Sequence, residues 1–251
     1  MSAKKNAPVE RSLTDDYFEL RLYQCAPGRL ADLHYRMSVE IPPLFARHGV
    51  VRPLAYWDGF SGPMTPLYAY LLRHKSLDDR MTAFTSFYSD PEWGRVRRES
   101  NAGSQMVERI DVYFMRAAPG WEKLMDRSAS GPVGGLHELR LRHVEGGDAP
   151  RATATMTELD LPVLQENGAT VLGVFNMWMG GRMPQIVSLV AWPDDAARAK
   201  GNAAYEADPR IKAARIKERK ELNRSLFGPG PTYLLRPAPY GTAQANLGPL
   251  P

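Results

Sequence analysis

The chain has one cysteine, Cys25, among its 251 residues. A single thiol excludes an intrachain disulfide and a multi-thiolate metal site. The lack of disulfides fits a reducing compartment, and we expect the protein to be cytoplasmic. Cys25 ends an expected strand with no base beside it, so we interpret it as a passive buried thiol and not as a nucleophile.

Long hydrophobic runs are also missing. No stretch approaches the roughly 20 apolar residues that cross a bilayer, so we expect no membrane span. The N-terminus carries Lys4 and Lys5 without an apolar segment after them, which excludes a secretory signal. We interpret residues 1–16 as a flexible leader.

Histidine is scarce, and the five histidines show no metal-ligand spacing, so we expect no metal. The sequence contains no nucleophile elbow and no Ser-His-Asp order. A formal charge of +4 is too small to indicate nucleic acid. The basic stretch 210–224 mixes both signs, which is typical of a solvated helix face.

The chain does contain an internal repeat. Glu19-Leu20-Arg21-Leu22 returns as Glu138-Leu139-Arg140-Leu141, and Asp90-Pro91 returns as Asp208-Pro209. With 43% apolar and 24% charged residues, the composition is that of a globular protein. Two copies at this wide spacing predict a duplicated domain and not a solenoid.

Each copy contains the same order of elements. Residues 17–25 alternate between apolar and polar side chains, as a strand does, and residues 30–44 follow with helical spacing. A glycine-rich hairpin, a second helical region and a last strand complete a β-α-β-β-α-β unit, the ferredoxin-like plan. The predicted division is a leader 1–16, a first repeat 17–116, a linker 117–135, a second repeat 136–236 and an extended tail 237–251.

The first copy resembles the NIPSNAP family. The resemblance is carried by Tyr17, Glu19, Arg21, Tyr23, Pro27-Gly28, Arg47-His48-Gly49, Trp57, Ser76-Leu77-Asp78-Asp79-Arg80 and Asp90-Pro91-Glu92-Trp93. It implies an α+β fold in which two ferredoxin-like units pair their sheets into a dimeric α+β barrel. Because this chain holds both units, we expect an intrachain barrel.

The repeated strand also suggests where chemistry could lie. If Leu20 and Leu22 face the helices, alternation turns Glu19 and Arg21 toward the barrel interior. We therefore expect catalytic roles for Glu19, Arg21, Arg140 and His143, and ligand contacts from Tyr23, Tyr56, Tyr68, Tyr70, Glu138, Arg142 and Asn176. The structural alternative is that the Glu-Arg pairs only fix strand register or bridge the two copies, since buried charges need partners.

These residues favour a small-molecule enzyme with a pocket inside the barrel. The expected chemistry is cofactor-free proton transfer, of isomerase, cyclase or lyase type, on an apolar or aromatic carbonyl compound. One alternative is a non-catalytic ligand-binding or protein-interaction module. Another, implied by the wider barrel superfamily, is a haem-binding protein or a cofactor-free monooxygenase. The expected partner is a small molecule, and further homodimerisation stays open.

Overall fold

The computed structural model describes residues 15–125 and 131–244. The leader up to residue 14, residues 126–130 of the linker and residues 245–251 of the tail lie outside this part. The first repeat contains β1 (Tyr17–Cys25), α1 (Leu30–Tyr35), α2 (Ile41–Arg47), β2 (Ala55–Ser61), β3 (Leu67–His74), α3 (Leu77–Tyr88), α4 (Pro91–Ser100) and β4 (Val107–Ala117). The second contains β5 (Leu136–His143), α6 (Ala149–Thr155), α7 (Leu161–Glu166), β6 (Thr170–Met179), β7 (Gln185–Trp192), α8 (Asp195–Ala207), α9 (Pro209–Leu222) and β8 (Thr232–Pro237).

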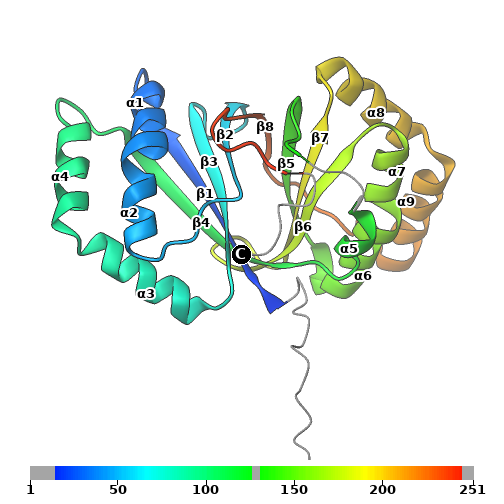
Figure 1. Cartoon of the computed structure of the whole chain (residues 1–251). Coiled ribbons are helices and arrows are strands. Elements are labelled where there is room, and N and C mark those ends of the chain that lie inside the picture. Colours follow the sequence, from blue (N-terminus) through cyan, green and yellow to red (C-terminus); the bar gives the residue numbers. More distant parts are fainter. Residues whose placement is uncertain (1–14, 126–130, 245–251) are drawn as a thin grey trace, which may run out of the picture.

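The strands form one closed barrel in the order β1-β3-β2-β8-β5-β7-β6-β4, with β4 returning to β1. Each repeat contributes a four-stranded sheet, and the repeats join through the antiparallel pairs β2–β8 and β4–β6. The expected α+β fold with two ferredoxin-like units in an intrachain barrel is therefore confirmed. Figure 1 shows the helices of the two repeats on opposite sides of this barrel.

Local sequence explains where the second pair of helices in each repeat begins. Ser76 caps α3 by accepting a hydrogen bond from the Asp79 N–H, and Asp90 caps α4 in the same way. Proline follows Asp90 and Asp208 at the first helical position, where a missing N–H costs no hydrogen bond. The short polar caps thus set the start of both helices against the sheet.

The first pair of helices is joined by a π-helical turn in each repeat, Arg36–Glu40 and Met156–Asp160. Proline follows both turns, with Pro42-Pro43 in α2 and Pro162 in α7. Proline cannot donate the backbone hydrogen bond that continues an α-helix. Wide turns of this kind often accompany functional sites.

The barrel interior is apolar and solidly packed. Leu20 and Leu22 point into it together with Trp57, Leu139 and Phe175, all nearly without solvent exposure. The gap left among the interior side chains is about 10 Å³, which is at or below the minimum that holds one water. The prediction of a ligand pocket inside the barrel is therefore wrong.

The predicted orientation of the repeated strand is also wrong. Glu19, Arg21 and Tyr23 lie on the outer face of β1, beneath the helices of the first repeat, and not in the interior. The physical reason is that a buried carboxylate needs charged partners. Arg80 on α3 supplies one, whereas the side chains facing the centre of the barrel are apolar.

Two connecting segments add to the barrel. Within the predicted linker, the short helix α5 (Trp121–Leu124) buries Trp121 against Phe18 and Phe175. After β8, residues 238–244 fold back on β2, where the Tyr56 N–H donates to the Gly241 carbonyl. Across residues 15–125 and 131–244, none of the helices combines the length and apolar character needed to cross a membrane.

Candidate functional site

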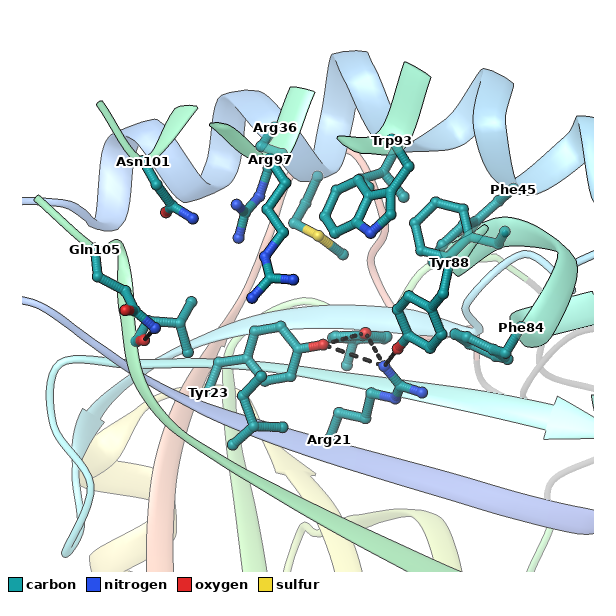
Figure 2. A pocket seen from close by; sticks show the side chains of 16 residues that line it. Arg21, Tyr23, Arg36, Phe45, Phe84, Tyr88, Trp93, Arg97, Asn101 and Gln105 are labelled. Atoms are coloured by element: carbon teal, nitrogen blue, oxygen red, sulfur yellow. Dashed lines mark hydrogen bonds between the residues drawn. The ribbon is translucent and has the colours of Figure 1, made fainter. Parts of the chain in front are cut away.

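A cavity of about 250 Å³ lies between the outer face of the first sheet and its helices. Its floor comes from β1, β3 and β4, and its roof comes from the helices α2, α3 and α4 with the turn between α1 and α2 (Figure 2). The lining residues are Arg21, Tyr23, Arg36, Met37, Ile41, Phe45, Tyr70, Phe84, Phe87, Tyr88, Trp93, Arg97, Asn101, Gln105, Val107 and Ile110. Three arginines and several aromatic rings line the cavity, but no carboxylate, imidazole or thiol does.

Arg21 organises the floor of this cavity. Its Nη1 lies 3.2 Å from each of the hydroxyls of Tyr23, Tyr70 and Tyr88. The Tyr23 and Tyr70 hydroxyls are 2.8 Å apart, and the Arg21 guanidinium lies 4.4 Å from the centroid of the Phe84 ring. Burial raises the pKa of Tyr70 well above its usual value, although Arg21 opposes the shift. At neutral pH Tyr70 is therefore a hydrogen-bond donor and not a base.

Glu19 holds Arg21 from behind, away from the cavity. Its carboxylate accepts from Arg21 Nε at 2.6 Å, from Arg80 at 2.9 Å and from His74 Nε2 at 3.0 Å. Burial alone would raise the pKa of Glu19, but His74, Arg80 and Arg21 outweigh it and keep the pKa far below its usual range. A carboxylate held by three donors orients Arg21 and is a poor proton acceptor.

Arg36 and Arg97 come from the helix side of the cavity, and Figure 2 shows Arg97 extending toward Tyr23 with Arg36 closer to the helices. Arg36 is 7% exposed, and its Nη1 donates to Ser100 Oγ at 3.2 Å, but its buried Nε has no hydrogen-bond partner among residues 15–125 and 131–244. Burial, aided by the charge of Arg97, lowers the pKa of Arg36. Two facing cations in an aromatic cavity make an environment that favours an anion.

Sequence reasoning missed these two arginines, although a signal for Arg36 was present. It stands three residues after Leu33 and next to Met37, within the apolar stripe of the helix. A cation at such a position needs a specific partner or a role. Arg97 follows Trp93 by four residues and so shares its helix face. Trp93 was used only as a mark of the family resemblance.

The predicted site residues of the first repeat divide into two groups. Arg21, Tyr23 and Tyr70 meet in the cavity. Tyr56 and Tyr68 lie instead beside Tyr240, with Tyr68 Oη 3.0 Å from Tyr240 Oη.

The predicted residues of the second repeat, His143 excepted, lie beneath its own helices, across the barrel from this cavity. Arg140 pairs with Glu138 at 2.7 Å and donates to Asn202. Asn176 accepts a hydrogen bond from Thr153. His143 lies on the same strand face as Leu139 and Leu141, away from Arg140, and its buried Nδ1 has no partner in the described part of the chain. The four predicted catalytic residues therefore do not form one site.

The corresponding space in the second repeat is filled by charged side chains. Asp160 stands where the first repeat has Ile41, and it pairs with Arg215, the counterpart of Arg97. Arg142 replaces Tyr23, lies 3.7 Å from Asp160 and stacks on Phe227. These pairs satisfy the arginines that would otherwise attract an anion.

Metal chemistry has no candidate ligand set in this part of the structure. Among residues 15–125 and 131–244, no group of three or more His, Cys, Asp or Glu side chains is arranged to hold an ion.

Comparison with known proteins identifies relatives by sequence and by fold. The sequence model of the NIPSNAP family matches residues 18–128 and 137–225. None of the curated proteins matches the chain. An uncharacterised NIPSNAP-like domain protein from Burkholderia xenovorans shares 18% identity over 40% of this chain and 84% of its own, with a TM-score of 0.35.

Two solved structures align with nearly the whole barrel. A chlorite dismutase variant from Candidatus Nitrospira defluvii covers 90% of this chain and 92% of its own, at 10% identity and a TM-score of 0.52. A putative monooxygenase from Lactobacillus acidophilus covers 92% and 97%, at 8% identity and a TM-score of 0.54. At such low identity these similarities establish the fold alone.

Proposed function

Since the chain belongs to the NIPSNAP family, whose fold leaves the reaction open, we propose a function from the cavity itself. The protein binds an aromatic or apolar carbonyl compound that carries a carboxylate, and stabilises the enolate form of that compound. The observation that carries this proposal is Arg36, a buried cation whose Nε has no partner in the described structure. Its cavity is lined by Arg21 and Arg97, and no carboxylate is among the described lining residues.

The two sides of the cavity suit the two ends of such a molecule. Arg36 and Arg97 on the roof bind the carboxylate, because guanidinium groups match its geometry. On the floor, Tyr23 and Tyr70 with Arg21 present donors to the enolate oxygen, as an oxyanion hole does. The aromatic walls take the apolar body, and about 250 Å³ suits a small ligand.

The chemistry follows from the absence of a carboxylate, imidazole or thiol, which could accept a proton, among the described lining residues. The enolate is stabilised by donors, and the proton from the α-carbon passes to water. Reprotonation at another position gives an isomerase-type reaction without a cofactor. If the protein binds the compound but does not exchange its protons, the alternative of a non-catalytic ligand-binding module applies.

The haem alternative does not fit this cavity. Haem iron needs an axial histidine, thiolate, methionine or tyrosinate. No histidine or cysteine lines the cavity, and burial keeps Tyr70 protonated. Met37 lies among apolar neighbours, in a volume near the lower end for drug-sized ligands. The proposed reaction therefore does not involve haem.

Phenylpyruvate is a suitable probe, because it combines an aromatic ring, a carboxylate and an enolisable ketone. We expect calorimetry to show binding, and NMR in D₂O to show accelerated exchange of the methylene protons. Arg36→Met should weaken binding about 10- to 100-fold, the range for loss of a charge-assisted hydrogen bond.

Arg98→Met is the matched control, because Arg98 is exposed on α4 next to Arg97 and does not line the cavity. Its binding constant should stay at the wild-type value. Equal losses in both variants would mean that only the overall positive charge attracts the ligand, and the proposal would fail. Circular dichroism of both variants establishes that the fold is intact.

A further inference from the structure

A second group of polar side chains gathers where the C-terminal segment returns to the first repeat. The Ala238 N–H donates to the Tyr56 carbonyl, and the Tyr56 N–H donates to the Gly241 carbonyl at 2.8 Å. The Tyr240 ring packs against Tyr56 and His34, with centroids 5.3 and 5.7 Å away. Tyr240 is therefore held in place although it lies beyond the last strand.

The Tyr240 hydroxyl belongs to a chain of proton donors and acceptors. His34 Nδ1 lies 2.6 Å from it, and Tyr68 Oη lies 3.0 Å from it. His34 Nε2 lies 2.6 Å from Asp58 Oδ1, close enough for an ion pair, although the contact fails the angular requirement of a hydrogen bond. The Asp58 charge favours a proton on Nε2, which leaves Nδ1 free to accept from Tyr240.

This arrangement is that of a nucleophile, a base and an orienting carboxylate. Burial raises the pKa of Tyr240 to about 12, so its phenol is protonated at neutral pH. It can attack an electrophile only if its proton has an acceptor. His34 supplies that acceptor, and Asp58 stabilises the imidazolium that forms.

The Tyr240 side chain also lines a cavity of about 490 Å³ on the outside of the first repeat. Its other lining residues are Met37, Ser38, Pro42, Phe45, Ala46, Val50, Arg52, Pro53 and Tyr56. Of the lining residues, only Met37 and Phe45 also line the cavity that contains Arg21, Arg36 and Arg97. Arg52 is exposed and is the charged residue in this lining, so an anionic group of a bound molecule has one cation to pair with.

We propose that Tyr240, His34 and Asp58 form a second site, which takes an aromatic or apolar acyl compound bearing a carboxylate. Tyr240 Oη bonds to the acyl carbon, the bond to the leaving group breaks, and the leaving group departs with the electron pair. The phenol proton moves to His34 Nδ1. Water then takes the acyl group from Tyr240, which releases the acid and restores the phenol.

The test uses para-(fluorosulfonyl)benzoate, an aromatic carboxylate whose sulfur accepts a phenol oxygen and releases fluoride. Peptide mapping by mass spectrometry gives the labelling rate of each tyrosine. Tyr240 should be labelled faster than Tyr35, which is 60% exposed on α1 and has no imidazole hydrogen bond in the described part of the chain. His34→Gln should slow labelling of Tyr240 by about 100-fold or more, the usual worth of a positioned base.

Two further variants separate the parts of the proposal. Arg52→Gln should slow labelling by the carboxylate probe but not by benzenesulfonyl fluoride, which carries no anion. Asp58→Asn should slow both probes, and it replaces His34→Gln if that variant does not fold. Labelling of Tyr35 as fast as Tyr240, or a Tyr240 rate that neither His34→Gln nor Asp58→Asn changes, would overturn the proposal.

Discussion

Replacing Glu19 with glutamine tests whether the repeated Glu-Arg pair stabilises the fold. Glu19→Gln keeps the shape of the side chain but leaves Arg21 and Arg80 without their counter-charge. Glu19 has no solvent exposure, and the Arg21 side chain is 5% exposed. Breaking a buried pair from one side costs about 3–5 kcal/mol. For a chain of this size, that corresponds to a fall in Tm of about 6–20 °C.

Glu138→Gln in the second repeat is the matched comparison. Its partners Arg140 and Arg198 are 16% and 24% exposed, so water can solvate them when the carboxylate charge is lost. We expect a smaller loss of stability than for Glu19→Gln, measured by urea denaturation. Equal losses of stability in the two variants would refute the reasoning from burial. So would a free energy of unfolding for Glu19→Gln that lies within about 1 kcal/mol of the wild-type value.

The same pair predicts a pH dependence. The pKa of Glu19 is lower in the folded protein than its ordinary value of 4.5, because His74, Arg80 and Arg21 outweigh the opposing effect of burial. A carboxyl whose pKa is lower in the folded state stabilises the protein at pH values above its unfolded-state pKa. This stabilisation is lost as the pH falls to the folded-state pKa. The stability gap between wild type and Glu19→Gln should therefore persist at pH 5 and above, begin to narrow as the pH falls below the unfolded value of 4.5, and go on narrowing toward the lower folded value.

Two substitutions test the packing of the barrel and of the second helix layer. Leu139→Ala should destabilise the fold by about 2–5 kcal/mol in urea denaturation without changing phenylpyruvate binding, because Leu139 faces the packed interior and lies outside the cavity. In Gly201→Ala, the added Cβ would lie 2.3 Å from the Trp192 ring and 2.9 Å from the Asn167 carbonyl oxygen. We expect a loss of about 1–3 kcal/mol in thermal denaturation, although alanine favours helices.

The sequence was sufficient to predict the barrel but not which face of its strands points inward. Alternation along residues 17–25 marks two faces, and both are buried, because helices cover one and the opposite sheet covers the other. Glu19 and Leu22 are equally without exposure, so burial does not distinguish them. The deciding factor is the position of Arg80 and His74, which are distant in sequence and become partners of Glu19 only in the folded chain.

The candidate site was predictable only where its residues share a strand face. Arg21, Tyr23 and Tyr70 alternate in register on neighbouring strands and were identified together. Arg36 and Arg97 belong to helices, whose inward faces were interpreted as apolar. Tyr240 follows the last periodic segment, in a stretch whose pattern carries no sign of a hydrogen bond to His34.

The two repeats indicate which charges serve the fold and which serve the cavity. Both keep a buried glutamate clamped by an arginine on its own strand and another on the helix after the hairpin, Arg80 or Arg198. The pair is kept on both sides of the barrel, whereas the aromatic cavity described above lies in the first repeat, so the pair is best explained by structure.

The differences concentrate where β1 and β5 approach their helices. Tyr23 leaves Arg97 without an ion pair among the described residues, while Arg142 and Asp160 in the second repeat enclose Arg215. The ion pairs with Asp160 neutralise Arg142 and Arg215, so these arginines attract an anion less strongly, and their side chains fill the space. Among the described residues, Arg36 and Arg97 of the first repeat form no ion pair, whereas Arg142 and Arg215 of the second do. This difference is why the proposed ligand is placed beneath the helices of the first repeat.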